Sequence, residues 1–314
     1  MSEYPDALVI FGASGFIGRN VVEEARGKVG RIVGVTGRGT PVPGCHQMVT
    51  IDRLADIAVL PERTVAINVA AVRYDPGSFT SEQGMLFNCN LGIVNAFYSF
   101  CLSRGIKEAR QASSSAVYVA GADPLDDSAS IDLNRPPNRG ELGYAWSRRV
   151  AELAADVHHQ VSGIHTHSFR LTNPFGAFDT LDDRAAHVAT ALVIRVLKED
   201  GPLQLYGNPE AQRDFVYGGD VARIFLESCK IGGVHHALNL ARGEVISIRG
   251  FAELVLKAAG LNRPIQVSED LPPGVNIRRA TGGKLREAFP QIELRPLEQS
   301  LKETIAWYRE ALNG

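Results

Sequence analysis

Short apolar runs alternate with longer helical patterns through the first half of the chain. The runs are rich in Val, Ile and Ala and carry few charges, which is typical of strands buried on both faces of a sheet. We expect such strands at residues 7–12, 31–35, 48–51, 64–71, 108–115 and 163–171. Helical patterns lie between them near residues 16–28, 81–104 and 144–162. Strands that alternate with helices form right-handed βαβ units, so this half predicts a parallel sheet of the α/β class.

The pattern loosens after residue 172. A polar stretch that contains Pro and Gly, 172–183, precedes a helix expected near 184–199. Residues 214–228 again have the pattern of a strand followed by a helix, and 296–312 are expected to form a strongly amphipathic closing helix. We expect a smaller C-terminal lobe here, with the chain crossing back to the main sheet around residues 215–245.

The composition narrows the class of protein. The chain has 314 residues and a formal net charge of -2, with acidic and basic residues mixed throughout. Proteins that bind nucleic acid or membrane surfaces usually carry a one-signed patch or tail, so neither partner is expected. The longest apolar runs are strand-sized, far below a membrane span, and the N-terminus lacks the basic segment of a signal peptide. We therefore expect a cytoplasmic protein.

No metal site is expected from the sequence. The four cysteines form no close pair and have no metal-ligand spacing, which favours reduced thiols. They are Cys45, Cys89, Cys101 and Cys229. Six histidines lie near one another in the sequence without a clear ligand geometry. They are His158, His159, His165, His167, His235 and His236.

The segment GASGFIG, which starts at Gly12, joins the first predicted strand to the first predicted helix. Gly12 permits a tight turn, Gly15 lets a pyrophosphate approach the backbone, and Gly18 lets the helix pack closely on the strand. Three spaced glycines are a weak signal alone, but between a strand and a helix they indicate a dinucleotide site. Phe16 and Ile17 lie in the same loop and are expected to contact the cofactor. A turn without a ligand is the alternative.

The end of the second strand bears on the choice between NAD and NADP. A carboxylate there would bind a ribose 2′-hydroxyl, but VGVTGRG at 33–39 contains none. Arg38 lies in the right region, and a guanidinium can pair with a 2′-phosphate, so NADP is favoured over NAD. Arg38 as a solvated loop charge remains the alternative. Asp52, just after the third strand, is placed either to contact the adenine or to serve as a turn or cap residue.

Several weak motifs occur in a fixed order along nearly the whole chain. They are GASGFIG, TVAINVAA at 64–71, Asn90, SSSAVY at 113–118, Tyr144 and RDFVYGGDVAR at 213–223. Together they resemble the extended short-chain dehydrogenase/reductases, in particular the nucleotide-sugar epimerase/dehydratase group. The segments 237–255 and 278–289 look like the lobe that holds a nucleotide-sugar in that family.

The resemblance implies two parts and a doubly wound, Rossmann-type parallel sheet. The dinucleotide-binding domain would consist of residues 1–172 plus about 215–245. The smaller α/β substrate lobe would consist of residues 173–214 plus 246–314. Ala70, at the end of the strand at 64–71, is expected beside the cofactor.

The family carries a catalytic set of Ser or Thr, Tyr and Lys. Its serine lies four residues before the tyrosine of the strand-end pattern and maps to Ser114, and its catalytic tyrosine maps to Tyr144. A phenol with the ordinary pKa of about 10 is a poor base, but a nearby cation and the nicotinamide charge favour phenolate. The resemblance implies that Tyr144 takes a proton from a sugar hydroxyl as hydride leaves, while Ser114 hydrogen-bonds the same oxygen.

The lysine position is Arg148, which departs from the family pattern. Arginine keeps the positive charge and can donate hydrogen bonds to the cofactor ribose. It cannot lose a proton, and its planar head is larger. Stabilisation of a phenolate is compatible with this residue, whereas a proton relay through a lysine amine is not.

Within the family, residues 174–197 look most like the GDP-sugar epimerase/reductases of fucose biosynthesis. Those enzymes pair a histidine, here His187, with a cysteine two residues after the catalytic serine, where this chain has Ala116. Half of that acid/base pair is absent, which argues against a full double epimerisation. His187 either faces the substrate or is a helix N-terminal histidine without a role.

The resemblance implies four further substrate contacts. Ser115 lies beside the catalytic serine, and Asn173 follows a strand and could bond a sugar or phosphate. Arg213 and Arg279 could pair with the phosphates of the nucleotide. An ion pair between the lobes is the alternative role for these side chains, and it is favoured for Arg279.

Three functional hypotheses follow. The leading one is an NAD(P)-dependent enzyme that acts by hydride transfer at C4 of a nucleotide-linked sugar. The second is a non-catalytic dinucleotide-binding sensor or assembly protein, for which Arg148 is the main support. A reductase of a small carbonyl or steroid-like alcohol is the third, and Arg213 argues against it. The family often dimerises through the helices near 81–104 and 144–162, so a homodimer is expected.

Overall fold

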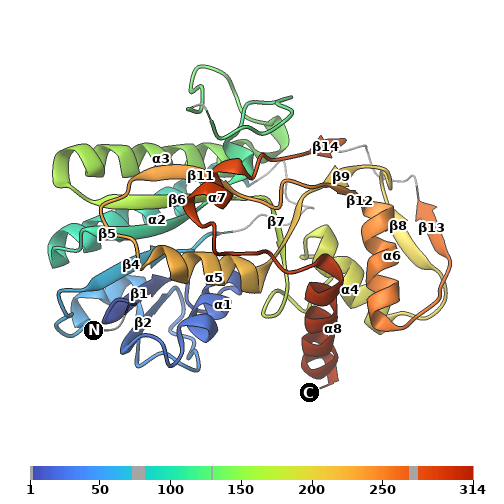
Figure 1. Ribbon diagram of the computed structural model, residues 1–314, viewed down its shortest axis with the longest axis horizontal. Helices are drawn as coiled ribbons and strands as arrows, with labels where there is room; N and C mark the ends of the chain where they lie inside the picture. Colours follow the sequence, from blue (N-terminus) through green and yellow to red (C-terminus); the bar gives the residue numbers. More distant parts are fainter. Residues whose placement is uncertain (1–2, 73–81, 129, 269–274, 314) are drawn as a thin grey trace.

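A seven-stranded parallel sheet forms the centre of the computed structural model, which describes residues 3–72, 82–128, 130–268 and 275–313 (Figure 1). The strand order is β11-β6-β5-β4-β1-β2-β3. The strands are β1 (Ala7–Phe11), β2 (Arg31–Thr36), β3 (Gln47–Thr50), β4 (Thr64–Asn68), β5 (Glu108–Ser114), β6 (His165–Leu171) and β11 (His236–Leu240). The order reverses between β1 and β4, the point at which doubly wound sheets bind ligands. The predicted Rossmann-type fold class is confirmed.

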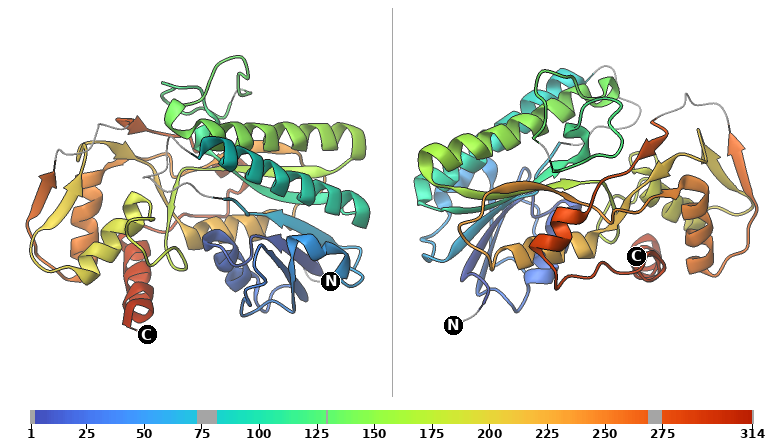
Figure 2. Two further views of the ribbon diagram at one scale, coloured as in Figure 1. Left: turned by 180° about the vertical axis from the view of Figure 1, so that it is seen from behind. Right: turned by 45° about the horizontal axis from the view of Figure 1, so that its top comes forward.

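Helices cover both faces of this sheet. On one face α2 (Gln83–Arg104) and α3 (Leu142–Ser162) lie side by side (Figure 1). On the other face α1 (Phe16–Ala25) packs along α5 (Gly218–Ser228), as both views of Figure 2 also show. The sheet is therefore enclosed by two helical layers.

The central strand β1 shows why the sheet is buried on both faces. All five of its side chains are buried. Leu8 and Ile10 belong to the core with α1 and α5, whereas Val9 and Phe11 belong to the core with α2 and α3. Full burial of an aliphatic or phenyl side chain contributes about 1.5–3 kcal/mol. A continuous apolar run in this strand thus serves two cores at once.

A smaller lobe holds a third core. Three helices enclose it, together with a parallel pair of strands. The helices are α4 (Val188–Lys198), α6 (Ile248–Ala259) and α8 (Leu297–Asn313), and the strands are β8 (Leu203–Tyr206) and β13 (Ile265–Ser268). The helix predicted near 184–199 thus begins only at Val188.

Very short strands connect the two parts. β7 (Asn173–Phe175) pairs in parallel with β10 (Phe215–Tyr217). β9 (Gln212–Arg213) lies between β12 (Ile246–Ser247) and β14 (Ile277–Arg278). These pairs fix where the smaller lobe meets the sheet, although each strand has only two or three residues.

One helix of the C-terminal region departs from the predicted division of the chain. α7 (Gly283–Ala288) packs against β11 of the main sheet. Leu285 and the following Phe289 are buried in the core that also holds α1 and α5. The segment 283–289, which was predicted to be part of the smaller lobe, therefore packs on the main sheet.

Helix α2 has a long and largely apolar sequence, although its continuous apolar runs stay strand-sized because Asn88, Asn90 and Asn95 interrupt them. From Gln83 to Ser103 this helix has no charged residue, and it is long and apolar enough to cross a membrane by length and composition alone. A single helix of this kind is weak support for a membrane span, because the core helix of a folded domain passes the same test. Phe97, Tyr98 and Phe100 on α2 are buried against the sheet.

Candidate active site

The turn between β1 and α1 is shaped by contacts that only glycine permits. Gly12 has a φ of +85°, and a Cβ there would lie 2.7 Å from the Cα of Ala70 at the end of β4. A Cβ on Gly18 would lie 2.0 Å from the carbonyl oxygen of Gly12. Gly15 differs, because its Cβ would meet just one described atom within 4 Å, at 3.3 Å. The packing of the protein itself thus requires Gly12 and Gly18, whereas Gly15 keeps the helix N-terminus open to a ligand.

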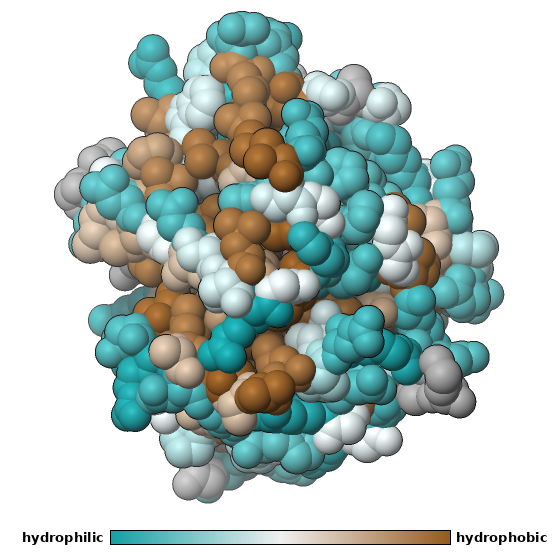
Figure 3. All heavy atoms as spheres, turned by 90° about the vertical axis from the view of Figure 1, so that its left-hand side faces the viewer, coloured by the Kyte–Doolittle hydropathy of each residue, from teal (hydrophilic) through white to brown (hydrophobic). Residues whose placement is uncertain are grey.

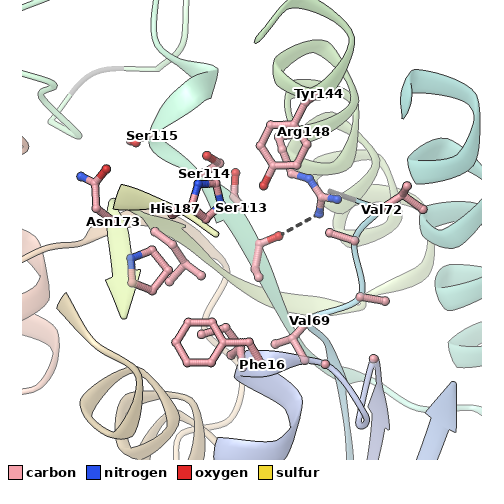
Figure 4. Close-up of a pocket in the computed structure, with 18 of the residues that line it drawn as sticks. Phe16, Val69, Val72, Ser113, Ser114, Ser115, Tyr144, Arg148, Asn173 and His187 are labelled. Atoms are coloured by element: carbon pink, nitrogen blue, oxygen red, sulfur yellow. Dashed lines mark hydrogen bonds between the residues drawn. The ribbon is translucent and has the colours of Figure 1, made fainter. Parts of the chain in front are cut away.

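A cavity of about 1120 Å³ extends from this turn to the smaller lobe (Figure 4). Most of the residues predicted for the site line it. They are Gly12, Gly15, Phe16, Ile17, Ala70, Ser114, Ser115, Tyr144, Arg148, Asn173, His187 and Arg213. The predicted residues that do not line it are Gly18, Arg38, Asp52 and Arg279.

Arg148 is buried beneath Tyr144, with an exposed fraction of 3%. Its Nη2 donates to Oδ1 of Asn90 at 2.6 Å, and its Nη1 donates to the carbonyl of Ala112 at 3.3 Å. The guanidinium carbon lies 5.1 Å from the centroid of the Tyr144 ring, within the range of a cation–π contact. Asn90 also bonds both backbone groups of Val72, at 3.1 and 3.2 Å. The cation is thereby held rigidly beside the phenol.

The end of β5 carries three serines with different partners. Ser114 Oγ accepts a hydrogen bond from the backbone N–H of Ala116 at 3.1 Å, which leaves its own proton available to a ligand. Ser115 begins a single 3-10 turn and also lines the cavity. Ser113, which the sequence analysis did not single out, lines the cavity too and donates to Glu152 at 2.5 Å.

The far end of the cavity is positively charged. Arg213 donates to the carbonyls of Gln212 at 2.8 Å and Val275 at 2.7 Å. Burial, together with the nearby Arg278 charge, lowers the pKa of Arg213 to about 10. Arg278 forms a two-pronged ion pair with Glu141, at 2.9 and 2.5 Å. An anionic group would relieve the repulsion between these two guanidinium groups.

Of the two roles considered for Arg279, phosphate contact and ion pair, the structure shows the ion pair that the sequence favoured. This side chain does not line the cavity; it pairs with Asp123 at 3.3 Å, which is the ion-pair alternative. The reason is the alternation of side chains along a strand. Arg278 lies directly opposite Arg213 in the pairing of β14 with β9, so the neighbouring Arg279 points elsewhere. The sequence held no signal for this register.

Asn173 and His187 stand where the two lobes meet. The Asn173 side chain donates to the carbonyl of Asp214 at 2.9 Å. The fully buried Asp214 carboxylate accepts the backbone N–H groups of Arg242 at 3.0 Å and Gly243 at 2.8 Å. Its burial raises the pKa of Asp214 to about 6. His187 immediately precedes α4 and also lines the cavity (Figure 4).

The end of β2 is compatible with a dinucleotide but does not select one. Thr36 and Gly37 line the cavity, and Thr36 Oγ1 accepts the backbone N–H of Gly39. Arg38 is exposed beside them. Asp52 is exposed as well, and a hydrogen bond with Thr50 lowers its pKa, which matches the turn interpretation of this residue. Its neighbour Ile51, rather than Asp52, lines the cavity.

A metal centre finds no support in the described part of the chain. No group of three or more His, Cys, Asp or Glu side chains there could hold a metal ion. The histidines instead contact one another: His159 stacks on His235 with ring centroids 4.3 Å apart, and His167 meets His236 at 4.5 Å.

The model of the NAD dependent epimerase/dehydratase family matches residues 8–241. The chain belongs to this family. The family and the relatives of this chain include nucleotide-sugar epimerases, dehydratases and reductases, which confirms the resemblance seen in the sequence.

Curated relatives are distant. The GDP-L-fucose synthase of Dictyostelium discoideum is 25% identical over 190 residues, which span 59% of this chain and 59% of that protein. The dTDP-4-dehydro-6-deoxy-D-allose reductase of Streptomyces bikiniensis is 22% identical over 320 residues, 96% of each chain. The match to the first relative therefore spans less than two thirds of its length.

Solved structures share the fold. The UDP-N-acetylglucosamine 4-epimerase of Methanobrevibacter ruminantium M1, in complex with UDP-N-acetylmuramic acid, has a TM-score of 0.82 at 20% identity and covers 98% of this chain and 99% of its own. A GDP-L-fucose synthetase of Naegleria fowleri bound to NADP has a TM-score of 0.80 at 20% identity, with coverages of 99% and 97%. Another neighbour, the UDP-glucose 4-epimerase of Thermus thermophilus, was solved with NAD. The neighbours thus include both dinucleotides.

Proposed function

We propose that this chain is an NAD(P)-dependent enzyme that oxidises or reduces C4 of a nucleotide-linked sugar. One observation carries the proposal: a single cavity joins the glycine turn, Ser114 and Tyr144 over a buried cation, and the arginine pair at its far end. A phosphate pair of the nucleotide would bind at Arg213 and Arg278, which places the sugar between them and Tyr144. When bound, the nicotinamide ring exchanges a hydride with the sugar carbon.

The protein residues handle the proton of that exchange. In the oxidative direction, the O–H bond at C4 breaks, its proton passes to the Oη of Tyr144, and C4 becomes a carbonyl as its hydride leaves. Ser114 donates a hydrogen bond to the same oxygen, because its Oγ already accepts from Ala116. In the reductive direction C4 receives a hydride and its oxygen receives the proton of Tyr144. Arg148 contributes charge and position but cannot carry the proton itself.

Two finer features belong to the same proposal. NADP is favoured because the end of β2 offers Arg38 and no carboxylate. Ala116 replaces the acid/base cysteine implied by the resemblance, so a single oxidation or reduction, rather than a double epimerisation, is proposed.

A homodimer through α2 and α3 is also proposed. The exposed side of these helices carries apolar side chains, with Met85 50%, Leu153 46%, Val157 49% and Val161 80% exposed. Figure 3 looks at the end of the molecule where α2 and α3 finish, and hydrophobic side chains gather in patches there. A two-fold pairing of this surface would bury them.

The deciding experiment starts from the protein as purified. Denaturation releases any bound dinucleotide for identification, and the emptied protein is then titrated with NAD and NADP and offered UDP-, GDP- and dTDP-sugars. We expect tight dinucleotide binding and a change in absorbance of reduced nicotinamide with one class of sugar. Tight binding without a response to any sugar would overturn the enzymatic proposal.

The competing function is a non-catalytic dinucleotide-binding protein, favoured by the engagement of Arg148 with Asn90 and Ala112. The titration above separates the two, and Arg148→Lys then tests what Arg148 contributes to an active enzyme. An enzyme in which Arg148 supplies only charge retains or gains turnover in this variant, whereas complete loss of activity would show that the planar fork of arginine is needed.

A further inference from the structure

A second cavity, of about 350 Å³, lies behind the active site. Its described walls are α3, β6, β11, residues 127–128 and 130–133, and the start of α7, which meet in the upper part of Figure 1. Among the described residues it shares no lining side chain with the large cavity. Its volume is at the lower end of ligand pockets, which makes it suitable for a small metabolite.

The acidic side chains of this cavity already have partners. Glu152 forms an ion pair with Arg170 at 2.7 Å, and both residues are largely buried. Asp156 lies 2.8 Å from the Nε2 of His235. Asp127 accepts a backbone N–H at 2.7 Å. The carboxylates are thus satisfied within the protein.

Two cations of the cavity are not neutralised in this way. Arg149 has an exposed fraction of 2% and donates to the carbonyls of Val117 and Arg135, both at 2.7 Å. Its Nη2 is buried and has no hydrogen-bond partner among the residues that the structure describes. Lys284 bonds the backbone carbonyl of Asp127. Within the described ranges neither cation forms a direct ion pair with a carboxylate, although the charges of Asp132 and Glu152 act on Arg149. The buried Nη2 of Arg149 is therefore the donor that remains for a ligand, with the half-buried Lys284 as a second cation.

Neutral polar groups complete the wall. Burial, followed by the charge of Arg110, lowers the pKa of His236 to about 4, so its imidazole is uncharged near neutral pH. Its buried Nε2 has no partner in the part of the chain that the structure describes. Ser128 and Ser130 line the same cavity, and the hydroxyl of Ser128, which donates to Asp126 at 2.8 Å, can still accept a hydrogen bond. These groups suit the hydroxyls of a ligand whose charged end lies at the cations.

We propose that this second cavity is a binding site for a small hydroxylated oxyanion, a metabolite no larger than a monosaccharide that carries one phosphate or carboxylate. The oxyanion pairs with Arg149 and Lys284, and its hydroxyls bond His236 and the two serines. Phosphate and carboxylate present the same acceptor chemistry to a guanidinium. The proposal does not depend on the sugar-nucleotide function proposed above.

The site adjoins the catalytic strand through two contacts. Glu152 accepts a hydrogen bond from Ser113, which lines the large cavity. Arg149 Nε holds the carbonyl of Val117, the last residue of the turn that begins at Ser115. An occupant of the second cavity therefore binds to the other side of the segment that carries Ser114.

Calorimetric titration with three probes tests the proposal: inorganic phosphate, glucose 6-phosphate and glucuronate. The dinucleotide is present throughout, so that the glycine turn is covered. We expect saturable binding of at least one of the two sugar derivatives. Glucose 6-phosphate alone would identify a phosphate ligand, glucuronate alone a carboxylate, and both a general oxyanion site.

Substitutions test whether the sugar derivatives bind in the second cavity. Lys284→Met and Arg149→Gln should each weaken this binding by about tenfold or more, because each removes a charge-assisted hydrogen bond. Lys302→Met on α8, a lysine with a 63% exposed side chain, is the matched control and should bind as the wild type does. If Arg149→Gln fails to fold, Lys284→Met decides, since Lys284 gives up one bond to a carbonyl.

Three results would overturn the proposal. One is the absence of binding by both sugar derivatives at affinities better than about 10 mM. Another is wild-type affinity in Lys284→Met. The third is loss of binding in Arg213→Gln with retention in Lys284→Met, which would locate the anion in the large cavity instead.

Discussion

At its cofactor end the large cavity is walled by backbone, with a turn in which Gly12 and Gly18 leave no room for a side chain. At its far end the wall consists of charged side chains: Arg213 and Arg278, on strands of two residues each, and Glu141, which pairs with Arg278 from the start of α3. The first end is fixed by steric exclusion and the second by electrostatic balance. Substitutions of Gly12 or Gly18 at the first end should therefore act on folding, and substitutions at the second end on ligand affinity.

Gly18→Ala should give the largest effect on stability. The Cβ added at this position would lie 2.0 Å from the carbonyl oxygen of Gly12. The backbone of the turn must therefore move, which should lower the free energy of unfolding by about 3 kcal/mol or more. Gly15→Ala is the matched control, because its Cβ meets one described atom at 3.3 Å and should cost about 1 kcal/mol. Urea denaturation measures both.

The same pair of variants tests the role of Gly15. Gly15→Ala should fold yet bind the dinucleotide at least about tenfold more weakly, because the methyl group occupies the space where a pyrophosphate meets the helix N-terminus. Fluorescence titration with NADP provides the measurement. Wild-type affinity in this variant would remove Gly15 from the cofactor site.

Tyr144→Phe lies between the two ends and should act on chemistry alone. Loss of the phenol should reduce turnover by about 10²–10⁴-fold and leave dinucleotide affinity unchanged, because the ring and its contact with Arg148 remain. Tyr206→Phe, at an exposed tyrosine of the substrate lobe, is the control. Turnover close to that of the control would exclude Tyr144 as the acid/base.

The contrast between the two ends also explains what the sequence revealed. The parallel sheet and the glycine turn were predictable, because β-branched runs and fixed glycine spacings report local requirements. The strand predicted at 64–71 ends at Asn68, because the chain leaves the sheet there to pass the glycine turn.

The charged end could not be predicted in the same way. Arg278, rather than Arg279, faces the cavity because β14 pairs with β9 in a register that two residues cannot signal. The bond between Arg148 and Asn90 joins residues 58 positions apart in sequence. Such contacts depend on how α2 and α3 pack, which a single sequence does not display.

Arg213→Gln should affect only the substrate. Removal of its charge should weaken the affinity for the nucleotide-sugar by about tenfold to a hundredfold, with little change in dinucleotide affinity. Arg279→Gln is the neighbouring control, and because its ion pair with Asp123 is exposed, it should change affinity and stability by no more than about 1 kcal/mol. Equal effects of the two substitutions would remove the functional distinction between the arginines.

An effect that depends on pH, and is absent at neutral pH, should lie outside both ends, on the paired strands β6 and β11 at one side of the sheet. Burial, reinforced by the charge of Arg110, lowers the pKa of His167 from 6.5 to about 2. The same two causes lower the pKa of His236 to about 4. Below pH 6.5 these two histidines bind protons in the unfolded chain but stay neutral in the folded chain. The free energy of unfolding therefore falls as the pH falls toward 4. Each such histidine contributes about 1.4 kcal/mol per pH unit.

His167→Phe isolates one of these contributions. Between pH 6 and 4 the variant should lose stability less steeply than the wild type, by up to about 1.4 kcal/mol per pH unit. At pH 8 the two proteins differ only through packing, so that measurement serves as the reference for the acid series. Urea denaturation at each pH provides the free energies. Parallel stability curves would mean that His167 takes up its proton in the folded state, and that the edge of the sheet admits water where the structure shows it closed.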